Sequence, residues 1–310
     1  RPAANPLAPI LRDRGIVFLD GGLATALEAR GHDLDDPLWS ARILVDRPEE
    51  IAAVHRAYLE AGADCIITAS YQATPQGFAE AGFTEPEALR LLDRSVRLGL
   101  DARDAFWTGA AREARPRPRV AASVGPYGAY LADGSEYTGD YDLDEAALAA
   151  FHRLRLHRLA ESEADLLALE TLPSLPEVRA LAGLLAETDA WAWFSFSCRD
   201  GGHLRDGSVV EDAALAVADT PRVAAIGVNC THPRHVPELV SRIGAVTDRP
   251  VLAYPNSGEA YRSETKSWSG RGTAGWTDGA RSWVEAGASI VGGCCRVGPD
   301  AIGALRRTLT

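Results

Sequence analysis

Two adjacent cysteines, Cys294 and Cys295, stand near the end of the sequence, directly after Gly292-Gly293 and the apolar run 288–291. Thiolates are good ligands for zinc, and two neighbours can occupy two corners of one tetrahedron. The glycines let the backbone turn and come close to a ligand. Free cysteine is also an ordinary core residue. Neighbouring zinc ligands are usually separated by about two to four residues in the sequence, whereas these two are adjacent. The pair alone leaves both interpretations open.

A third cysteine, Cys230, follows the apolar run 223–228 and Asn229. Three thiolates with an open fourth position are typical of a catalytic zinc site rather than a structural one. Such an electron-rich zinc is suited to binding and deprotonating another thiol, whose sulfur stays nucleophilic. His232 and His235 follow closely and could supply a fourth ligand, as in a structural zinc site. That alternative is less favoured, because a histidine in a polar loop is more often solvated.

Two carboxylates, Asp20 and Glu170, also follow apolar runs and could both accept hydrogen bonds from an ammonium group. Gly21-Gly22 opens an expected helix, Leu23 to Ala29, and offers backbone N–H groups to a carboxylate. An amino acid that carries a thiol would fit all these features. The alternatives are a helix N-cap for Asp20 and a buried ion pair for Glu170. A glycosidase pair of acids is conceivable, but it leaves the cysteines without a role.

Short apolar runs alternate with helical patterns from one end of the chain to the other. The expected strands are 16–19, 65–69, 120–124, 165–169, 192–197, 223–228, 251–254 and 289–291. The expected helices are 48–62, 85–114, 144–163, 175–187, 209–218, 237–246, 277–286 and 300–309. Eight strand–helix units predict an α/β fold, a (β/α)8 barrel. An open doubly wound sheet is less favoured, because no dinucleotide fingerprint follows the first strand and no Walker A sequence occurs.

The active sites of such barrels lie at the C-terminal ends of the strands. On this rim we expect polar or metal-binding residues that each come at or just after the end of an apolar run: Asp20, Tyr71, Glu170, Asn229, Cys230, Asn256, Cys294 and Cys295. Core packing alone would scatter such residues over both ends. Cys65 begins a strand and is interpreted as a core residue, and Cys198 is left outside the site.

The composition excludes several classes of function. The chain has 310 residues, of which 46% are hydrophobic and 24% charged, with a net charge of −11. That balance predicts a soluble protein with a sizeable core and argues against binding to nucleic acid or an anionic membrane. No apolar run reaches the roughly 20 residues that cross a bilayer, and no signal peptide is evident. Five cysteines without a framework spacing predict a cytoplasmic location.

The sequence resembles the homocysteine S-methyltransferases from about Gly15 to Leu305. The specific motifs are Asp20-Gly21-Gly22 with 27–31, Gly227-Val228-Asn229-Cys230, and 292–296 with the cysteine pair, in that order. Four further segments look similar: 68–74, 123–128, 170–173 and 254–259. We therefore expect one homocysteine-binding barrel domain over residues 1–310.

The resemblance implies zinc on Cys230, Cys294 and Cys295, with the homocysteine sulfur as the fourth ligand. It implies transfer of a methyl group to homocysteine, so that methionine forms by direct in-line displacement. A sulfonium is already a good leaving group, so positioning and a desolvated nucleophile supply most of the catalysis.

Substrate-binding residues also follow from the resemblance. Asp20 and Glu170 are expected to hold the amino group of homocysteine, and the amides of Gly21-Gly22 to lie near its carboxylate. Tyr71 is expected to meet the cationic donor by a cation–π contact. Asn229 is expected to orient the surroundings of Cys230 or a substrate carboxylate.

The segments 71–74 and 129–141 look most similar to the branch of the family that uses S-methylmethionine and often S-adenosylmethionine. Betaine-using relatives carry a C-terminal extension, and folate-dependent methionine synthases have further domains, for which 310 residues leave no room. A small assembly, a monomer or a small homo-oligomer, is expected. Trp39 is a second candidate for contact with the donor.

Other functions remain as alternatives. Within the family these are a betaine-using enzyme and an enzyme that methylates selenocysteine or selenohomocysteine. A lyase or aldolase would need carboxylate and histidine ligands or a Schiff-base lysine, and Lys266 is the only lysine. A zinc-binding or thiol-binding protein without turnover would hold the metal and form no methionine.

Overall fold

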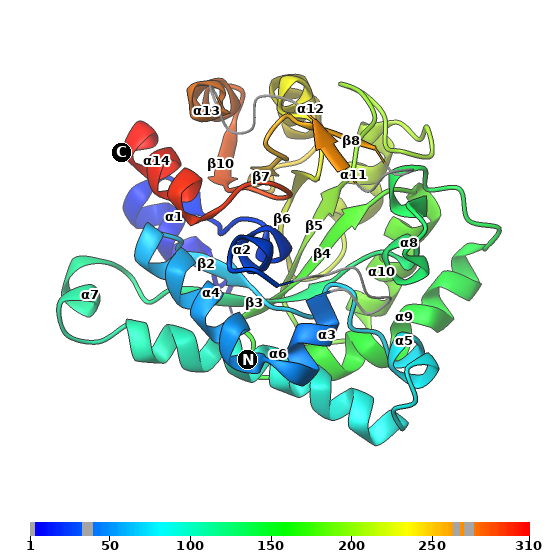
Figure 1. Cartoon of the computed structure of the whole chain (residues 1–310). Coiled ribbons are helices and arrows are strands. Elements are labelled where there is room, and N and C mark those ends of the chain that lie inside the picture. Colours follow the sequence, from blue (N-terminus) through cyan, green and yellow to red (C-terminus); the bar gives the residue numbers. More distant parts are fainter. Residues whose placement is uncertain (1–3, 33–39, 263–266, 270–275) are drawn as a thin grey trace.

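Eight parallel strands form the centre of the molecule, and helices surround them (Figure 1). The computed structural model describes residues 4–32, 40–262, 267–269 and 276–310. The order in the sheet is β1-β10-β7-β6-β5-β4-β3-β2. The strands are β1 (Val17–Phe18), β2 (Cys65–Ile67), β3 (Arg119–Val124), β4 (Leu166–Leu172), β5 (Ala192–Phe196), β6 (Val223–Asn229), β7 (Val251–Tyr254) and β10 (Ala288–Val291). A short antiparallel hairpin, β8 (Ala260–Arg262) and β9 (Ser267–Ser269), lies outside this sheet.

The sheet closes between its first and second strands. Leu19 forms a parallel bridge with Cys65, and the Asp20 amide donates to the carbonyl oxygen of Cys65 at 3.1 Å. On the other side of the bridge the Asp64 amide donates to the Phe18 carbonyl at 2.6 Å. These bonds complete the ring, and the predicted (β/α)8 barrel is confirmed.

Strand side chains alternate between the barrel interior and the layer under the helices, as the two-residue period of a strand requires. On β4, Leu166 and Ala168 belong to the interior cluster, and Leu167 and Leu169 belong to the larger cluster beneath the helices. Cys65 lies in the interior cluster, which confirms its interpretation as a core residue.

The helices follow the expected alternation with the strands. They are α1 (Ala8–Arg14), α2 (Leu23–Ala29), α3 (Ser40–Asp46), α4 (Pro48–Ala61), α5 (Pro75–Glu80), α6 (Glu85–Phe106), α7 (Gly109–Ala114), α8 (Tyr127–Leu131), α9 (Glu145–Glu161), α10 (Leu175–Ala186), α11 (Val210–Ala218), α12 (Val236–Gly244), α13 (Trp276–Glu285) and α14 (Pro299–Leu309). Two 3-10 turns, η1 (Ser135–Tyr137) and η2 (Pro233–His235), lie in the loops after β3 and β6.

One predicted helix is wrong in its length. The pattern over 85–114 suggested a single helix, but the chain leaves α6 at Trp107 and begins α7 at Gly109. The Trp107 indole N–H donates to the Arg115 carbonyl at 3.2 Å, which ties the residue after α7 to the end of α6.

An N-terminal segment that the sequence did not predict to be helical closes the far end of the barrel. Leu7 and Ile10, at the start of α1, belong to the barrel-interior cluster. The Asn5 side chain donates to the Ala224 carbonyl at 2.9 Å, and Arg119 donates to the Pro6 carbonyl at 3.0 Å. The segment therefore plugs the N-terminal end of the strands, opposite the rim where the cysteines lie.

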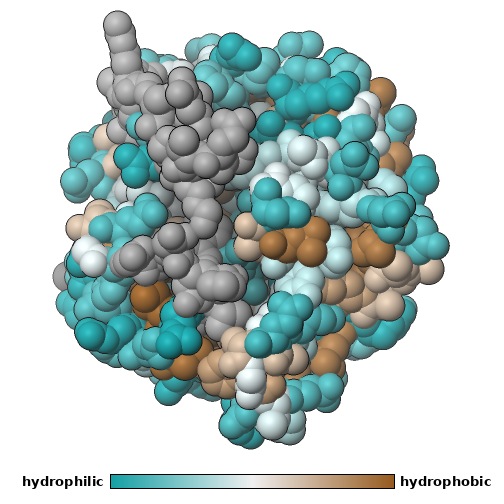
Figure 2. Space-filling model, turned by 45° about the vertical axis from the view of Figure 1, so that its right-hand side comes forward, coloured by the Kyte–Doolittle hydropathy of each residue, from teal (hydrophilic) through white to brown (hydrophobic). Residues whose placement is uncertain are grey.

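The face of the molecule that Figure 2 shows is largely hydrophilic, with some apolar side chains toward its right and lower right. The large hydrophobic side chains among the described residues that are exposed are Leu131, Leu154, Leu215 and Val284. Across the part of the chain that the structure describes, no helix is both long and apolar enough to traverse a lipid bilayer.

Replacement of Asp64 by Asn should destabilise the barrel. This carboxylate is 1% exposed, and it accepts hydrogen bonds from the Phe18 amide (3.2 Å), Arg115 (3.1 Å) and Arg306 (3.3 Å). Without its charge these arginines face one another beside the closing strands. We expect the free energy of unfolding to fall by about 2–4 kcal/mol in urea titrations, because a buried cation loses its partner.

The matched control is Asp93→Asn, which removes an ion pair with Arg158 whose side chains are 41% and 40% exposed. That change should cost less than about 1 kcal/mol. Equal losses in the two variants would contradict a stabilising role for the buried cluster.

Candidate active site

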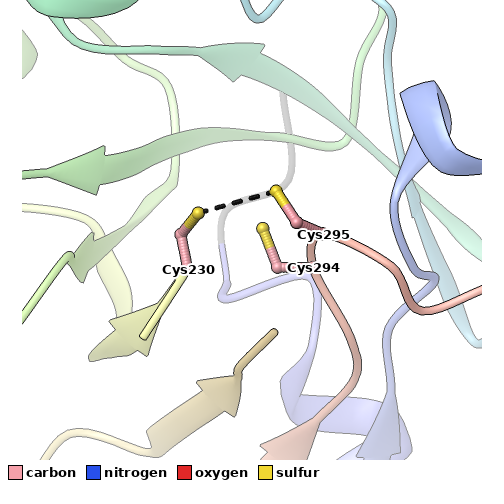
Figure 3. A group of neighbouring side chains, drawn as sticks. All are labelled: Cys230, Cys294 and Cys295. Carbon is pink, nitrogen blue, oxygen red and sulfur yellow. Dashed lines mark hydrogen bonds between the residues drawn. The ribbon is translucent and has the colours of Figure 1, made fainter. Parts of the chain in front are cut away.

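Three cysteines meet at the C-terminal rim of the barrel (Figure 3). Cys230 follows β6, and Cys294 and Cys295 follow β10. Their Sγ atoms all lie within 4.8 Å of one another, and those of Cys230 and Cys295 are 3.8 Å apart. Zinc–sulfur bonds of about 2.3 Å place two sulfurs of a tetrahedron about 3.8 Å apart. The three sulfurs therefore fit three corners around one metal ion.

Close backbone contacts bring the cysteine pair to this position. A Cβ on Gly292 would lie 2.6 Å from the Cβ of Leu19, so only glycine lets the end of β10 pass this close to β1. The amide of Gly293 donates to the Asp20 carbonyl at 3.0 Å, and that of Cys295 donates to the Asn256 side chain at 3.2 Å. The glycines permit close packing of β10 on β1, and their expected approach to a ligand stays a prediction.

The ionisation of the three thiols is coupled. Hydrogen bonds from the Cys294 and Cys295 thiols hold the pKa of Cys230 well below its usual value. The pKa values of Cys294 and Cys295 are raised, first because each is hydrogen-bonded to Cys230 and further because they are buried beside its negative charge. The protein alone thus favours one thiolate, and a cation between the sulfurs would favour all three.

The other candidate ligands lie elsewhere. Among the described residues, the group that could hold a metal contains only the three cysteines. His232 Nδ1 accepts a hydrogen bond from the Arg234 amide at 3.2 Å, and His235 lies beside it in the turn η2. Cys198 is buried in the cluster beneath the helices.

Asp20 is held at the junction of β1 and β2. Its Oδ2 accepts a hydrogen bond from the Ile67 amide at 2.8 Å, and its buried Oδ1 has no partner. It does not cap α2, because Gly22 is the N-cap residue of that helix. Burial raises its pKa well above the usual value, and the nearby Glu170 raises it further.

Glu170 points into the same rim from β4. Its Oε1 accepts a hydrogen bond from the Ser123 hydroxyl, and its Oε2 accepts one from the Tyr254 hydroxyl at 3.0 Å. These neutral donors take the place of the buried ion pair that was the alternative. Burial raises the pKa of Glu170 to about 7, although both hydrogen bonds favour the charged form.

The end of strand β4 differs from the prediction. The strand was expected to stop at Leu169, but it continues to Leu172, and its pairing with β5 is irregular between these residues. Thr171 takes a left-handed backbone conformation there, with φ of 61°. Asn229 holds it, accepting from the Thr171 amide at 2.8 Å and donating to its hydroxyl at 2.7 Å.

Asn229 also reaches the cysteine cluster. Its side-chain N–H group lies 3.9 Å from Cys294 Sγ, within hydrogen-bonding distance for sulfur. Cys230, the next residue, has a φ of 49°. Positive φ in non-glycine residues is uncommon and gathers at functional sites, where surrounding contacts maintain it.

A pocket opens onto these groups. The residues that line it come from seven of the eight strand ends or from the loops beyond them: Gly21, Gly22, Leu23, Ala24, Thr25, Ile67, Thr68, Tyr71, Glu136, Tyr137, Glu170, Thr171, Cys230, Tyr254, Gly293, Cys294 and Cys295. It includes Tyr71, as expected. The Gly22 amide already donates to the Val297 carbonyl at 2.9 Å, so it is not available to a ligand as expected.

Several residues at the site were not recognised from the sequence. Ser123 and Tyr254 lie within strands, and their hydroxyls donate hydrogen bonds to Glu170. In the sequence, only the alternation that directs these side chains toward the barrel interior could have indicated this role. Behind the pocket, the buried Arg155 of α9 donates to the carbonyl oxygens of Tyr71 (3.2 Å) and Gly125 (2.6 Å). A lone arginine in a helical pattern carries no signal of such a role.

Two residues mentioned in the sequence analysis, Trp39 and Lys266, lie outside the described residues.

Comparison with known proteins gives a consistent result. The model of the family described as homocysteine S-methyltransferase matches residues 17–309. Homocysteine S-methyltransferase YbgG of Bacillus subtilis is 48% identical over 301 residues, 96% of this chain and 96% of that protein. Homocysteine S-methyltransferase of Escherichia coli is 48% identical over 305 residues, 97% of this chain and 98% of that protein.

A solved structure shares the fold over nearly the whole chain. The metallated form of the homocysteine methyltransferase MmuM from Escherichia coli matches with a TM-score of 0.88 and 46% sequence identity. The match covers 98% of this chain and 99% of that one.

Replacement of Tyr254 by Phe should raise the pKa of Glu170 above about 7, because the lost hydrogen bond stabilised the charged carboxylate. A hydrogen bond to a charged group contributes about 1.5–3 kcal/mol, so its loss should raise this pKa by roughly one to two units. Difference infrared titration can follow the protonated carboxyl band, assigned by its loss in Glu170→Gln.

Tyr130→Phe is the control, because that hydroxyl donates to the exposed Glu80 instead. An unchanged titration of Glu170 in Tyr254→Phe would contradict the assigned bond.

Proposed function

This chain belongs to the homocysteine S-methyltransferase family, and from that premise we propose that it transfers a methyl group from S-methylmethionine to homocysteine at the cysteine rim. It is an enzyme of the methyltransferase class. The observation that carries the proposal is the group of three Sγ atoms within 4.8 Å of one another, beside two buried carboxylates that have no cationic partner among the described residues.

The metal of the site is proposed to be zinc, held by Cys230, Cys294 and Cys295. The all-sulfur donor set, the 3.8 Å separation of Cys230 and Cys295, and the metallated form of the Escherichia coli relative support a metal here. When bound, zinc would lower the pKa of the substrate thiol and leave its sulfur nucleophilic.

The proposed position of homocysteine follows from the unpaired polar groups. Its ammonium group would bind the free Oδ1 of Asp20 and the Glu170 carboxylate. Its carboxylate would approach the first turn of α2, where the amides of Leu23 and Ala24 have no partner within the helix. A cation at Asp20 and Glu170 would also favour their charged forms, which burial opposes.

Methyl transfer then needs only positioning and charge balance. The homocysteine thiol loses its proton to solvent before the transfer. Its sulfur attacks the methyl carbon in line with the carbon–sulfonium bond, and a new sulfur–carbon bond forms as the old one breaks. The leaving sulfur keeps the electron pair and becomes a neutral sulfide. Both products are methionine, and no general acid is required.

The donor is the finer part of the proposal. The described residues that line the pocket include glutamates and no arginine, lysine or histidine. Such a lining attracts a molecule with net positive charge, as S-methylmethionine and S-adenosylmethionine both have, over the net-neutral betaine. Selenium analogues of the acceptor remain an alternative within the same chemistry, and so does binding without turnover.

We also propose a single domain over residues 1–310, a cytoplasmic location, and a monomer or small homo-oligomer. The barrel runs from Val17 to Val291 in one closed sheet, and all five cysteines are free, which suits a reducing compartment. The scattered exposed hydrophobic side chains suit a small assembly. Sedimentation equilibrium would measure its size, and a large oligomer would contradict that part.

Purified protein loaded with zinc should form methionine from homocysteine and S-methylmethionine. The rate should fall to background after chelation and return with zinc but not with magnesium, because thiolates bind zinc in preference. Parallel reactions with S-adenosylmethionine and betaine rank the donors. Absence of methionine with every donor would overturn the proposed function.

Replacement of Cys295 by Ser should weaken metal binding. Zinc sites in proteins bind with about 10–16 kcal/mol, so the loss of one of three thiolates is expected to lower affinity by roughly 100-fold. Titration with cobalt(II) measures this through the thiolate-to-cobalt absorption in the near ultraviolet. Cys198→Ala, a change at a buried cysteine outside the group, should leave the titration unchanged. Equal affinity in Cys295→Ser and the parent protein would show that the ligand set is wrong.

A further inference from the structure

The loop between β3 and α9 places a carboxylate in the pocket that the proposed reaction has not yet used. Glu136 lies in η1 and lines the pocket together with Tyr71, Tyr137 and the cysteines Cys230 and Cys295. Its Oε2 is buried and has no hydrogen-bond partner. A buried carboxylate oxygen without a partner is unfavourable, so its presence at a binding site indicates a ligand that supplies the missing donor.

The backbone holds Glu136 firmly in place. A Cβ on Gly128 would lie 2.4 Å from the Glu136 amide nitrogen, so η1 packs directly on α8 at a position that admits only glycine. At the start of the same turn, the Asp133 carboxylate accepts a hydrogen bond from the Ser135 amide at 2.9 Å. Glu136 therefore projects into the pocket from a packed turn.

Among the described residues, Arg205 is the arginine beside Glu136, and its hydrogen bonds go to other groups. Arg205 lies over the Tyr137 ring, 5.6 Å from its centre, and donates to the Ser197 hydroxyl at 3.0 Å and to the Cys230 carbonyl at 3.3 Å. Burial raises the pKa of Glu136 to about 7, as expected for a carboxyl with no cation bonded to it.

Glu136 can therefore accept a cationic group of the substrates. The ammonium group of homocysteine is already assigned to Asp20 and Glu170, at the base of the pocket. The donor brings two more positive charges, a sulfonium and an α-ammonium. The sulfonium loses its charge as the methyl group leaves, so a carboxylate there would stabilise the ground state more than the transition state and slow the reaction. The α-ammonium keeps its charge throughout.

We propose that Glu136 binds the α-ammonium group of the methyl donor and so selects donors that are amino acids. This inference rests on the proposed function. The aromatic ring of Tyr71, which lines the same pocket, is left for the sulfonium, whose contact with it is weaker than an ion pair.

The test is a comparison of Glu136→Gln with the parent enzyme. The KM for S-methylmethionine should rise about tenfold, as for loss of a charged hydrogen bond, while kcat and the KM for homocysteine stay within about twofold. Asp140→Asn is the matched control: it removes one negative charge from an exposed residue of the same loop and should leave all three constants unchanged.

A second donor makes the test specific. 4-(Dimethylsulfonio)butanoate is S-methylmethionine without its amino group. Calorimetric binding to the parent enzyme should be weaker for this compound than for S-methylmethionine by about the same tenfold factor, and Glu136→Gln should add no further loss. Binding needs no turnover, so the result stands apart from the activity assay.

Three results in the kinetic assay would overturn the inference. These are an unchanged KM for S-methylmethionine in Glu136→Gln, an equal rise in Asp140→Asn, and a rise confined to homocysteine. Further weakening of the amino-free donor by Glu136→Gln would also overturn it, because the carboxylate would then act on the sulfonium. If the parent protein makes no methionine but binds S-methylmethionine in the predicted way, the proposed function fails and the ammonium site stands.

Discussion

The rest of the site depends on one electrostatic constraint: within the described part of the chain, acidic groups are buried on one rim of the barrel without cationic side chains bonded to them. The hydrogen bonds that Asp20 and Glu170 do accept come from an amide and from two hydroxyls, all neutral donors. The three thiols share hydrogen bonds that favour a single thiolate. Burial makes the charged forms of these groups unfavourable. A bound cation compensates for the lost hydration, so the charged rim is stabilised when cations bind.

The backbone of the barrel accepts irregular geometry to assemble this rim. The Asp20 side chain adds a hydrogen bond between β1 and β2, which it accepts from the Ile67 amide. One residue thus helps to close the sheet and lies on the rim beside the pocket. Thr171 and Cys230 both have positive φ values, and Asn229 bonds the first of them and adjoins the second. Strain of about 1–3 kcal/mol at each such residue persists only where many contacts maintain it. The large core supplies that support.

Much of the fold was predictable because strand periodicity and helix ends are local properties. The eight strands fall where short apolar runs end at polar residues, and Pro48 and Gly62 mark the limits of α4. The errors lie where tertiary contacts decide. The break after α6 depends on the Trp107 indole bonding Arg115, and the extension of β4 depends on Asn229 holding Thr171. Arg115 lies 8 residues from Trp107, and Asn229 lies 58 residues from Thr171, so both partners are beyond the reach of a local pattern.

The sequence by itself determined which strand ends carry cysteine and carboxylate, and from these it predicted a thiol-binding metal site in a barrel. It could do so because parallel strands bring their C-terminal ends to one rim whatever the details of packing. Only the tertiary structure decided which of those groups are already satisfied. The Gly22 amide is occupied by Val297, whereas Asp20 Oδ1 and Glu136 Oε2 are left without partners. Hydrogen-bond partners at a site come from distant segments, and their distances follow from packing, which no local pattern encodes.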